Sequence, residues 1–140
     1  MDSGGCPVTD YTARYVDAAH SASRRERYDA SFFTTPCGDA DLETIAHIVE
    51  SHGSRPHTDV LMHGDYRLPN IILDHWSFSG FVDLDHAGLA DRHIAVFWAL
   101  WTLRFNLHTD EYRDRFIDVY GRDLIDEDML RVVAAVEVFG

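Results

Sequence analysis

The residues best suited to chemistry lie in one stretch near the middle of the sequence, HGDYRLPNIILDHWSFSGFVDLD, which runs from His63 to Asp85. Asp65 and Asn70 lie five residues apart across a turn that Pro69 restrains, so both side chains can point into one pocket. Asp83 interrupts an apolar run beside what the pattern indicates is a buried hairpin. A buried carboxylate is costly unless a cation or hydrogen-bond donors compensate it, so Asp83 either has a structural role or binds a metal ion.

Two carboxylates and one carboxamide form a hard-oxygen site of the kind that Mg²⁺ prefers. If one carboxylate and the carboxamide bind the metal ion, the other carboxylate remains free as a base. In phosphoryl transfer a base accepts the proton of the attacking hydroxyl, while oxygen ligands hold the ions that neutralise the phosphates. If Asp83 binds a metal ion rather than having a structural role, the stretch has the residue types that metal-assisted phosphoryl transfer uses.

The composition limits the class of protein. The 140 residues suit one domain, and a hydrophobic content of 46% is enough for a core. A formal net charge of −12 argues against a nucleic-acid partner and favours a polycationic small ligand, although the same charge could serve solubility alone. All twelve basic residues are arginine, so any mechanism that requires a lysine from this chain is excluded.

The sequence also predicts a cytoplasmic protein without a membrane partner. Its polar first ten residues, MDSGGCPVTD, lack the apolar core of a secretory signal, and the longest apolar stretch, residues 94–103, is too short to span a bilayer. Cys6 and Cys37 do not have the spacing of metal ligands, and we expect free thiols.

The elements that must position the candidate residues follow from hydrophobic periodicity, capping residues and turns. Helical signals occur at residues 10–28, 41–51 and 92–105, and Asp41 and Asp91 would cap the second and third of these helices. Two more helices follow Thr109 and Asp126, which would cap them, and Gly121 would end the first of the two. Strand signals occur at residues 60–62, 71–73 and 78–84, the last two joined by a DHWS turn. After Gly88 the pattern is helical to the end. The sequence predicts an α+β fold that is mostly helical, with a short β-hairpin.

HGDYRLPN followed by GFVDLD resembles the catalytic loop and metal-binding segment of the aminoglycoside phosphotransferases, bacterial antibiotic kinases with a protein-kinase-like fold. CPVTDYTARYV upstream and ADRHIAVFWALWTL and YRDRFIDVYGRD downstream are similar too, and the likeness is greatest to the aminoglycoside 3′-phosphotransferase branch. The resemblance implies that residues 1–140 form the C-terminal lobe of that fold. The N-terminal nucleotide-binding lobe, with its phosphate-covering loop and lysine, has no counterpart here.

The resemblance also implies a role for each candidate residue. Asp65 would be the catalytic base, and Asn70 and Asp83 would hold Mg²⁺, with ATP as the phosphoryl donor. His63 and Gly64 would shape the loop rather than react.

A further acid falls where the family binds its cationic drugs. Glu137 would contact the aminoglycoside, assisted by the C-terminal carboxylate, and the alternative for Glu137 is simple surface charge.

Three positions depart from the family pattern. Asp85 replaces a glycine, which adds negative charge near the phosphates and removes backbone freedom. Ala95 replaces an aspartate that braces the catalytic loop, and its loss would leave main-chain donors unsatisfied at a cost of about 1–3 kcal/mol. Trp101 stands where a polar residue is common.

The favoured function is ATP-dependent phosphorylation of an aminoglycoside hydroxyl, by a chain that is weakly active or inactive alone. One alternative is a non-catalytic remnant or binding module of the family, and another is a kinase of a different small molecule such as choline, homoserine or a macrolide. A metal hydrolase has the least support, because no H-E-x-x-H motif is present. Self-association is expected through the exposed face on which a second lobe would pack.

Overall fold

The computed structural model of the chain describes residues 12, 16–19, 21, 41–52, 56–65 and 67–139. Most of the helix expected over residues 10–28, both cysteines and the C-terminal carboxylate lie outside these residues. In chain order the elements are α2 (Leu42–His52), β1 (Val60–Met62), η2 (Leu68–Asn70), β2 (Ile71–Asp74), β3 (Ser77–Phe81), β4 (Gly88–Ala90), α3 (Arg92–Leu107), α4 (Arg113–Tyr120), η3 (Arg122–Leu124) and α5 (Glu127–Phe139). The expected α+β fold, mostly helical with a short hairpin, is confirmed.

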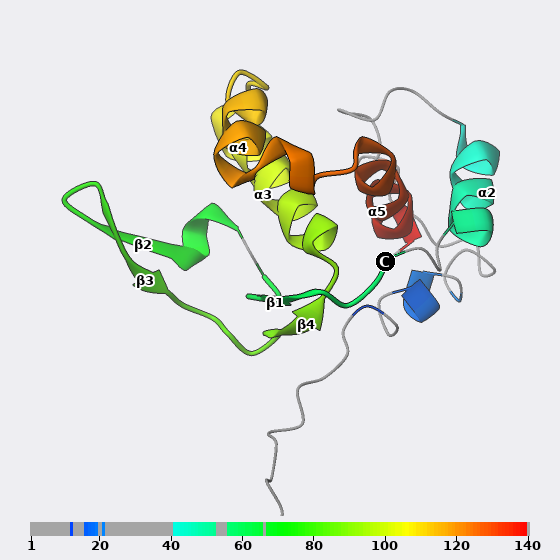
Figure 1. The fold of residues 1–140 in the computed structure, drawn as a ribbon, viewed down its shortest axis with the longest axis horizontal. Helices are drawn as coiled ribbons and strands as arrows, with labels where there is room; N and C mark the ends of the chain where they lie inside the picture. The colour runs from blue at the N-terminus through cyan, green and yellow to red at the C-terminus, as the bar shows by residue number, and fades with distance from the viewer. Residues whose placement is uncertain are drawn as a thin grey trace, which may run out of the picture.

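The core is helical and centres on α5. This helix packs against α2 on one side and α3 on the other (Figure 1). From Met129 to Phe139 every residue of α5 except Arg131 is buried, as expected for a helix that is apolar on nearly all sides. Within the described part of the chain, no helix has the length and apolarity needed to cross a bilayer.

The helix ends follow from local hydrogen bonds. Three aspartates accept hydrogen bonds from main-chain N–H groups of the first helical turn: Asp41 from Thr44 (2.8 Å), Asp91 from His93 (2.8 Å) and Asp126 from Asp128 (2.9 Å). The caps expected at Asp41, Asp91 and Asp126 are therefore confirmed. At the end of α4, Gly121 has a φ of 120° and donates its N–H to Ile117 O at 3.0 Å, which ends the helix as expected.

The start of α4 differs from the prediction. Thr109 does not cap this helix, because its Oγ1 accepts a hydrogen bond from the N–H of Glu111 (3.2 Å) in a turn. The helix begins at Arg113, after Tyr112, whose side chain makes no capping hydrogen bond.

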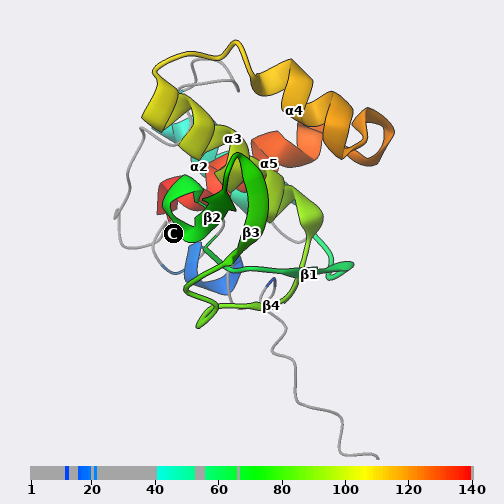
Figure 2. The ribbon, with the colours of Figure 1, turned by 90° about the vertical axis from the view of Figure 1, so that its left-hand side faces the viewer.

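The strands differ from the prediction in two places. The segment after Gly88 is not helical at its start, because β4 pairs antiparallel with β1, with Val60 opposite Ala90. This pair lies below the helices, on the side of the molecule away from α4 (Figures 1 and 2). A strand of three residues is too short to show a periodicity, so only its pairing reveals it. β3 ends at Phe81 rather than at residue 84, since the chain turns at Asp83, where φ is 60°.

The β2–β3 hairpin is exposed, which corrects the expectation that it is buried. Its two-residue loop is His75-Trp76, and both residues have positive φ (47° and 65°), as type I′ turns require. Trp76 is 94% exposed and Phe78 is 60% exposed. The hairpin extends away from the described helices (Figure 1), so none of these helices covers its apolar side chains.

Candidate active site

The candidate residues Asp65 and Asn70 lie in the loop between β1 and β2, and the structure brings them together. The N–H of Arg67 donates to Asp65 O, and the N–H of Asn70 donates to Arg67 O, each at 2.9 Å. These two turns fold the loop back on itself. The carboxamide nitrogen of Asn70 then donates to Asp65 O and to Asp65 Oδ2, both at 2.9 Å.

Arg67 controls the charge of Asp65. Its Nε donates to Asp65 Oδ1 in an ion pair, while Oδ2 accepts from Asn70. The hydrogen bond from Arg67 is the main reason that the pKa of Asp65 lies below its ordinary value; the bond from Asn70 adds to it, and partial burial opposes it. Asp65 is therefore an ionised acceptor at neutral pH, the state in which a carboxylate can take a proton.

Asp83 lies close to this pair but on the surface. The N–H of Val82 donates to Asn70 O at 3.0 Å, which ties the segment after β3 to the loop. Asp83 is exposed rather than buried. The pKa of Arg67 is raised, first by its hydrogen bond to Asp65 and further by the charges of Asp65 and Asp83. Arg67 thus interacts with both carboxylates of the candidate site.

The oxygen atoms of these residues fit a hard cation. The nitrogen of the Asn70 carboxamide is engaged by Asp65, and within the described chain its Oδ1 accepts no hydrogen bond. The Asp83 carboxylate likewise has no hydrogen bond or ion pair among the residues that the structure describes. No group of three or more His, Cys, Asp or Glu side chains there could form a metal site by itself. A metal ion at this loop would have few protein ligands, which is typical of Mg²⁺ bound together with phosphates.

His63 and Gly64 lie where they direct the course of the loop. His63 is 9% exposed, and its Nε2 donates to Val82 O at 2.7 Å, while its Nδ1 accepts the N–H of Asp65 at 3.3 Å. Gly64 has a φ of 89°, and a Cβ added there would lie 2.0 Å from His86 O. Both residues therefore act on the position of Asp65 through the backbone.

At four described residues of the loop, the loss of main-chain support expected from Ala95 is not seen. The N–H groups of four loop residues all have acceptors: Asp65, Arg67, Leu68 and Asn70. The acceptor for Leu68 is the buried Oγ1 of Thr102 on α3, at 3.3 Å. Sequence reasoning missed Thr102, because a threonine inside a helix gives no signal of its partner. Ala95 instead lines a half-open cavity of about 270 Å³ beside His63.

Asp85 also differs from the expectation. It lies in an exposed turn, and the left-handed backbone falls at Asp83 rather than at Asp85. The absence of a glycine at position 85 therefore causes no backbone strain, and the added negative charge is the remaining consequence.

Glu137 is not a simple surface charge. Its side chain lies on α5 facing α3, the residue is 7% exposed, and Oε1 accepts a hydrogen bond from Trp98 Nε1 at 2.7 Å. The structure thus places Glu137 in the interface between α5 and α3, beside Trp98.

Known proteins of similar sequence are phosphotransferases. The model of the phosphotransferase enzyme family matches residues 2–133. A probable aminoglycoside 3′-phosphotransferase of Lactococcus lactis subsp. lactis (strain IL1403) is 46% identical over 135 residues, which is 96% of this chain and 51% of the relative. A streptomycin 3″-kinase of Streptomyces griseus is 44% identical over 120 residues, which is 81% of this chain and 44% of the relative.

Solved structures agree with the fold. A type VIII aminoglycoside 3′-phosphotransferase has a TM-score of 0.63 and 22% identity, and the match covers 100% of this chain and 55% of the solved chain. A second structure is an aminoglycoside phosphotransferase from Streptomyces rimosus ATCC10970 in complex with ADP and streptomycin. It has a TM-score of 0.63 and 25% identity, and the match covers 96% of this chain and 54% of the solved chain. The chain spans about half the length of the relatives it matches.

Proposed function

The chain belongs to the phosphotransferase enzyme family, and we propose that it forms the catalytic-loop half of an ATP-dependent kinase that phosphorylates a hydroxyl group of an aminoglycoside. The observation that carries this proposal is the hydrogen-bonded pair of Asp65 and Asn70, with both Asn70 donor contacts at 2.9 Å. The 46% identity to the lactococcal relative supports the substrate class.

In the proposed reaction Asp65 accepts the proton of the attacking hydroxyl. Arg67 keeps Asp65 ionised, and Asn70 fixes the second carboxylate oxygen, so the hydroxyl approaches a carboxylate of defined orientation. Asn70 and Asp83 would hold Mg²⁺, which when bound neutralises phosphate charge. The acidic surface attracts the polycationic acceptor, and Glu137 would contact it.

We expect the chain by itself to turn over slowly. Positioning and charge neutralisation supply nearly all of the catalysis in phosphoryl transfer. The chain has no lysine, and Arg67 already pairs with the candidate base. Asp85 adds negative charge two residues after Asp83, which disfavours bound phosphates.

The test is ATP- and Mg²⁺-dependent phosphorylation of kanamycin and streptomycin, detected by mass spectrometry, together with calorimetric binding of the two drugs. Asp65→Asn should abolish transfer, whereas Asp74→Asn, at an exposed hairpin position, should leave it unchanged. If the drugs bind but no Asp65-dependent transfer is detected, the alternative of a non-catalytic binding module is favoured. Transfer to choline but not to either drug would favour another small-molecule kinase. If the chain neither binds nor modifies these drugs, the proposal is wrong.

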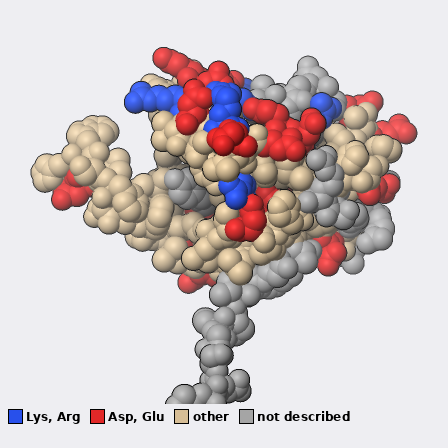
Figure 3. All heavy atoms as spheres, in the orientation of Figure 1, with Lys and Arg blue, Asp and Glu red and all other residues tan. Residues whose placement is uncertain are grey.

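We further propose that the protein works in the cytoplasm. We also propose that it self-associates through the exposed face on which a second lobe would pack, and that the β2–β3 hairpin forms part of that face. The hairpin surface is almost free of charge in the view of Figure 3, whereas acidic and basic side chains crowd the region of α4. Five of its apolar residues are more than 40% exposed: Ile72, Leu73, Trp76, Phe78 and Phe81. Sedimentation of the parent and of Phe78→Ser tests this, because a parent that stays monomeric at high concentration contradicts it.

A further inference from the structure

A half-open cavity of about 270 Å³ lies beside His63, and the proposed reaction does not use it. The residues that line it belong to β1, β3, α3 and α4, together with His63, which follows β1. These elements are distant from one another in the sequence. The cavity is therefore a feature of the packed fold and not of one surface loop.

The lining of the cavity is uncharged and rich in rings. Its ring side chains are those of His63, Phe81, Phe116 and Tyr120. The other lining side chains are apolar, and none of the described residues that line the cavity is Asp, Glu, Lys or Arg. Burying a charge without a partner is costly, whereas aromatic rings attract one another through edges and offset faces. The lining therefore favours a neutral aromatic ligand.

The rings of the cavity contact one another in pairs. His63 and Phe81 meet edge to face, with ring centroids 5.3 Å apart and planes at 68°. Phe116 and Tyr120, one helical turn apart on α4, stack with centroids 6.2 Å apart and planes at 21°. Both separations lie in the range in which aromatic rings attract each other. Walls that are already ordered lose little freedom when a ligand binds, which favours affinity.

Ala95 keeps the cavity apolar. It lies on α3 and lines the cavity, at the position where the family resemblance puts an aspartate. A carboxylate at this position would add a charge to a neutral lining and would occupy part of the space. The neutral cavity is therefore a property of this chain that the family pattern does not predict.

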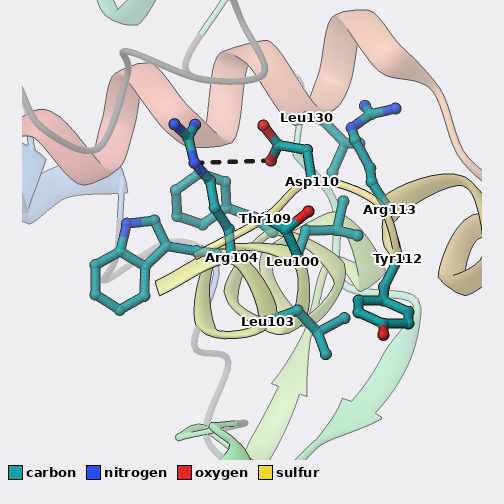
Figure 4. Close-up of a pocket in the computed structure, with 10 residues that line it drawn as sticks. Leu100, Leu103, Arg104, Thr109, Asp110, Tyr112, Arg113 and Leu130 are labelled. Atoms are coloured by element: carbon teal, nitrogen blue, oxygen red, sulfur yellow. Dashed lines mark ion pairs between the residues drawn. The ribbon is translucent and has the colours of Figure 1, made fainter. Parts of the chain in front are cut away.

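The volume of the cavity limits the ligand to about one ring. An apolar cavity of about 150 Å³ takes up benzene, whereas pockets for drug-sized molecules begin at about 300 Å³. The hollow at the turn between α3 and α4, where Arg104 and Asp110 point toward each other (Figure 4) and pair at 3.7 Å, is much smaller. It has room for only about 20 Å³, the space of one or two waters. Of these two spaces, only the cavity beside His63 is large enough for an organic ring.

His63 connects the cavity to the candidate base. Its Nε2 donates to Val82 O at 2.7 Å, and its Nδ1 accepts the N–H of Asp65 at 3.3 Å. Because both ring nitrogens are engaged, the faces and carbon edge of the ring are the parts left for a ligand. A ligand packed on this ring restricts its movement and, through the Nδ1 contact, the movement of the Asp65 main chain.

We propose that the cavity is a binding site for a neutral molecule with one aromatic ring, and that its ligand orders the loop of Asp65 through His63. The ligand packs among the rings of the lining, and Ala95 leaves space for it. Asp65, Asn70 and Asp83 do not line the cavity, so the site is separate from the residues proposed for phosphoryl transfer. The inference goes beyond the proposed function and does not rest on it.

Phenol is the probe, and NMR spectra of the whole chain, recorded without ATP, Mg²⁺ or drug, measure its binding. Nuclear Overhauser effects should connect phenol protons with the rings of His63 and Phe116, which locates the ligand directly. The amide signal of Asp65 should shift with the same saturation curve. Cyclohexanol has a saturated ring and a hydroxyl, and benzoate has an aromatic ring and a charge. Each should bind at least about fivefold more weakly than phenol.

Substitutions at Ala95 test the cavity independently. Ala95→Leu should weaken phenol binding at least about tenfold, because the larger side chain occupies the cavity. Ala95→Asp should have a similar effect, because it adds a charge. Ala18→Leu, at an exposed helical position, is the matched control and should bind like the parent. Thermal unfolding curves show whether each variant is folded, and the Overhauser effects in the parent test the site even where a variant is not.

Each result decides one part of the inference. If phenol does not bind the parent, or binds without Overhauser effects to these rings, the site is wrong. The site is equally wrong if folded Ala95→Leu binds phenol as tightly as the parent. Equal binding of cyclohexanol contradicts the selection of an aromatic ring, and equal binding of benzoate contradicts the selection of a neutral one. If phenol binds in the cavity but the amide signal of Asp65 does not move, the link through His63 is wrong. The proposed phosphorylation of an aminoglycoside stands or falls separately.

Discussion

The carboxamide nitrogen of Asn70 lies 2.9 Å from two atoms of Asp65, the main-chain oxygen and the carboxylate Oδ2. One side chain thus closes the loop and orients the carboxylate. Because both donors of the amide are engaged in this way, its oxygen is the atom left for a cation. The candidate base and a candidate metal ligand therefore form a single hydrogen-bonded unit.

Asn70→Ala should lower the free energy of unfolding by about 2 kcal/mol, because two hydrogen bonds worth about 1 kcal/mol each are lost. Mg²⁺ should raise the melting temperature of the parent but not of Asn70→Ala. Asn106→Ala is the matched control, since Asn106 also makes two carboxamide contacts, to Thr102 O and Oγ1. If Mg²⁺ stabilises all three proteins equally, the metal site at Asn70 is wrong.

Gly64→Ala should destabilise the protein by at least about 3 kcal/mol, because the new Cβ meets a backbone oxygen and the residue has a left-handed φ of 89°. The matched control is Gly80→Ala on β3, where an added Cβ meets no atom of the described residues within 4 Å beyond its chain neighbours, and the expected change is within about 0.5 kcal/mol. Urea unfolding measures both. A tolerated alanine at position 64 would mean that the loop does not depend on this glycine.

Asp91→Asn should cost about 3 kcal/mol in the free energy of unfolding. Asp91 is fully buried and accepts hydrogen bonds from His57 N (2.9 Å), His93 N (2.8 Å) and His93 Nδ1 (2.6 Å). Asp118→Asn, which breaks an exposed ion pair with Arg122, should cost less than about 1 kcal/mol. Chemical denaturation of the two variants compares them directly, and equal losses would argue against the buried network.

The contribution of Asp91 should also depend on pH. Burial tends to raise the pKa of this carboxyl, but hydrogen bonds from His93 and His57 outweigh it, so the pKa in the folded protein lies below its ordinary value. In the unfolded chain the pKa of an aspartate is about 3.9, so a lower pKa in the folded protein stabilises the fold fully at pH values above about 3.9. This stabilisation is lost as the pH falls through the pKa of the folded protein. The difference in unfolding free energy between parent and Asp91→Asn should be constant from about pH 5 to pH 7 and shrink below about pH 4. A difference that persists at pH 3 would contradict this.

Features that depend on neighbouring residues could be predicted from the sequence. Asp41 and Asp126 cap helices because the N–H groups they bind are two or three residues away. The hairpin loop and the closeness of Asp65 and Asn70 are local in the same sense. Their chemical roles came from the resemblance and stay predictions.

Features that depend on distant segments were decided by the tertiary structure. Val60 pairs with Ala90, and Thr102 Oγ1 accepts the N–H of Leu68. Trp98 Nε1 donates to Glu137 Oε1 across 39 residues of sequence.

What the sequence by itself determined about this protein is therefore most of its helices and the loop of its candidate residues, since local hydrogen bonds and apolar periodicity specify them. Its family was recognised from the resemblance of its motifs, not from these patterns. Only the tertiary structure decided which polar side chains are buried. Asp83 and Glu137 are both acids beside apolar residues in the sequence, yet Asp83 lies on the surface and Glu137 inside. Burial depends on which helix or strand packs over a residue, and no local pattern contains that information.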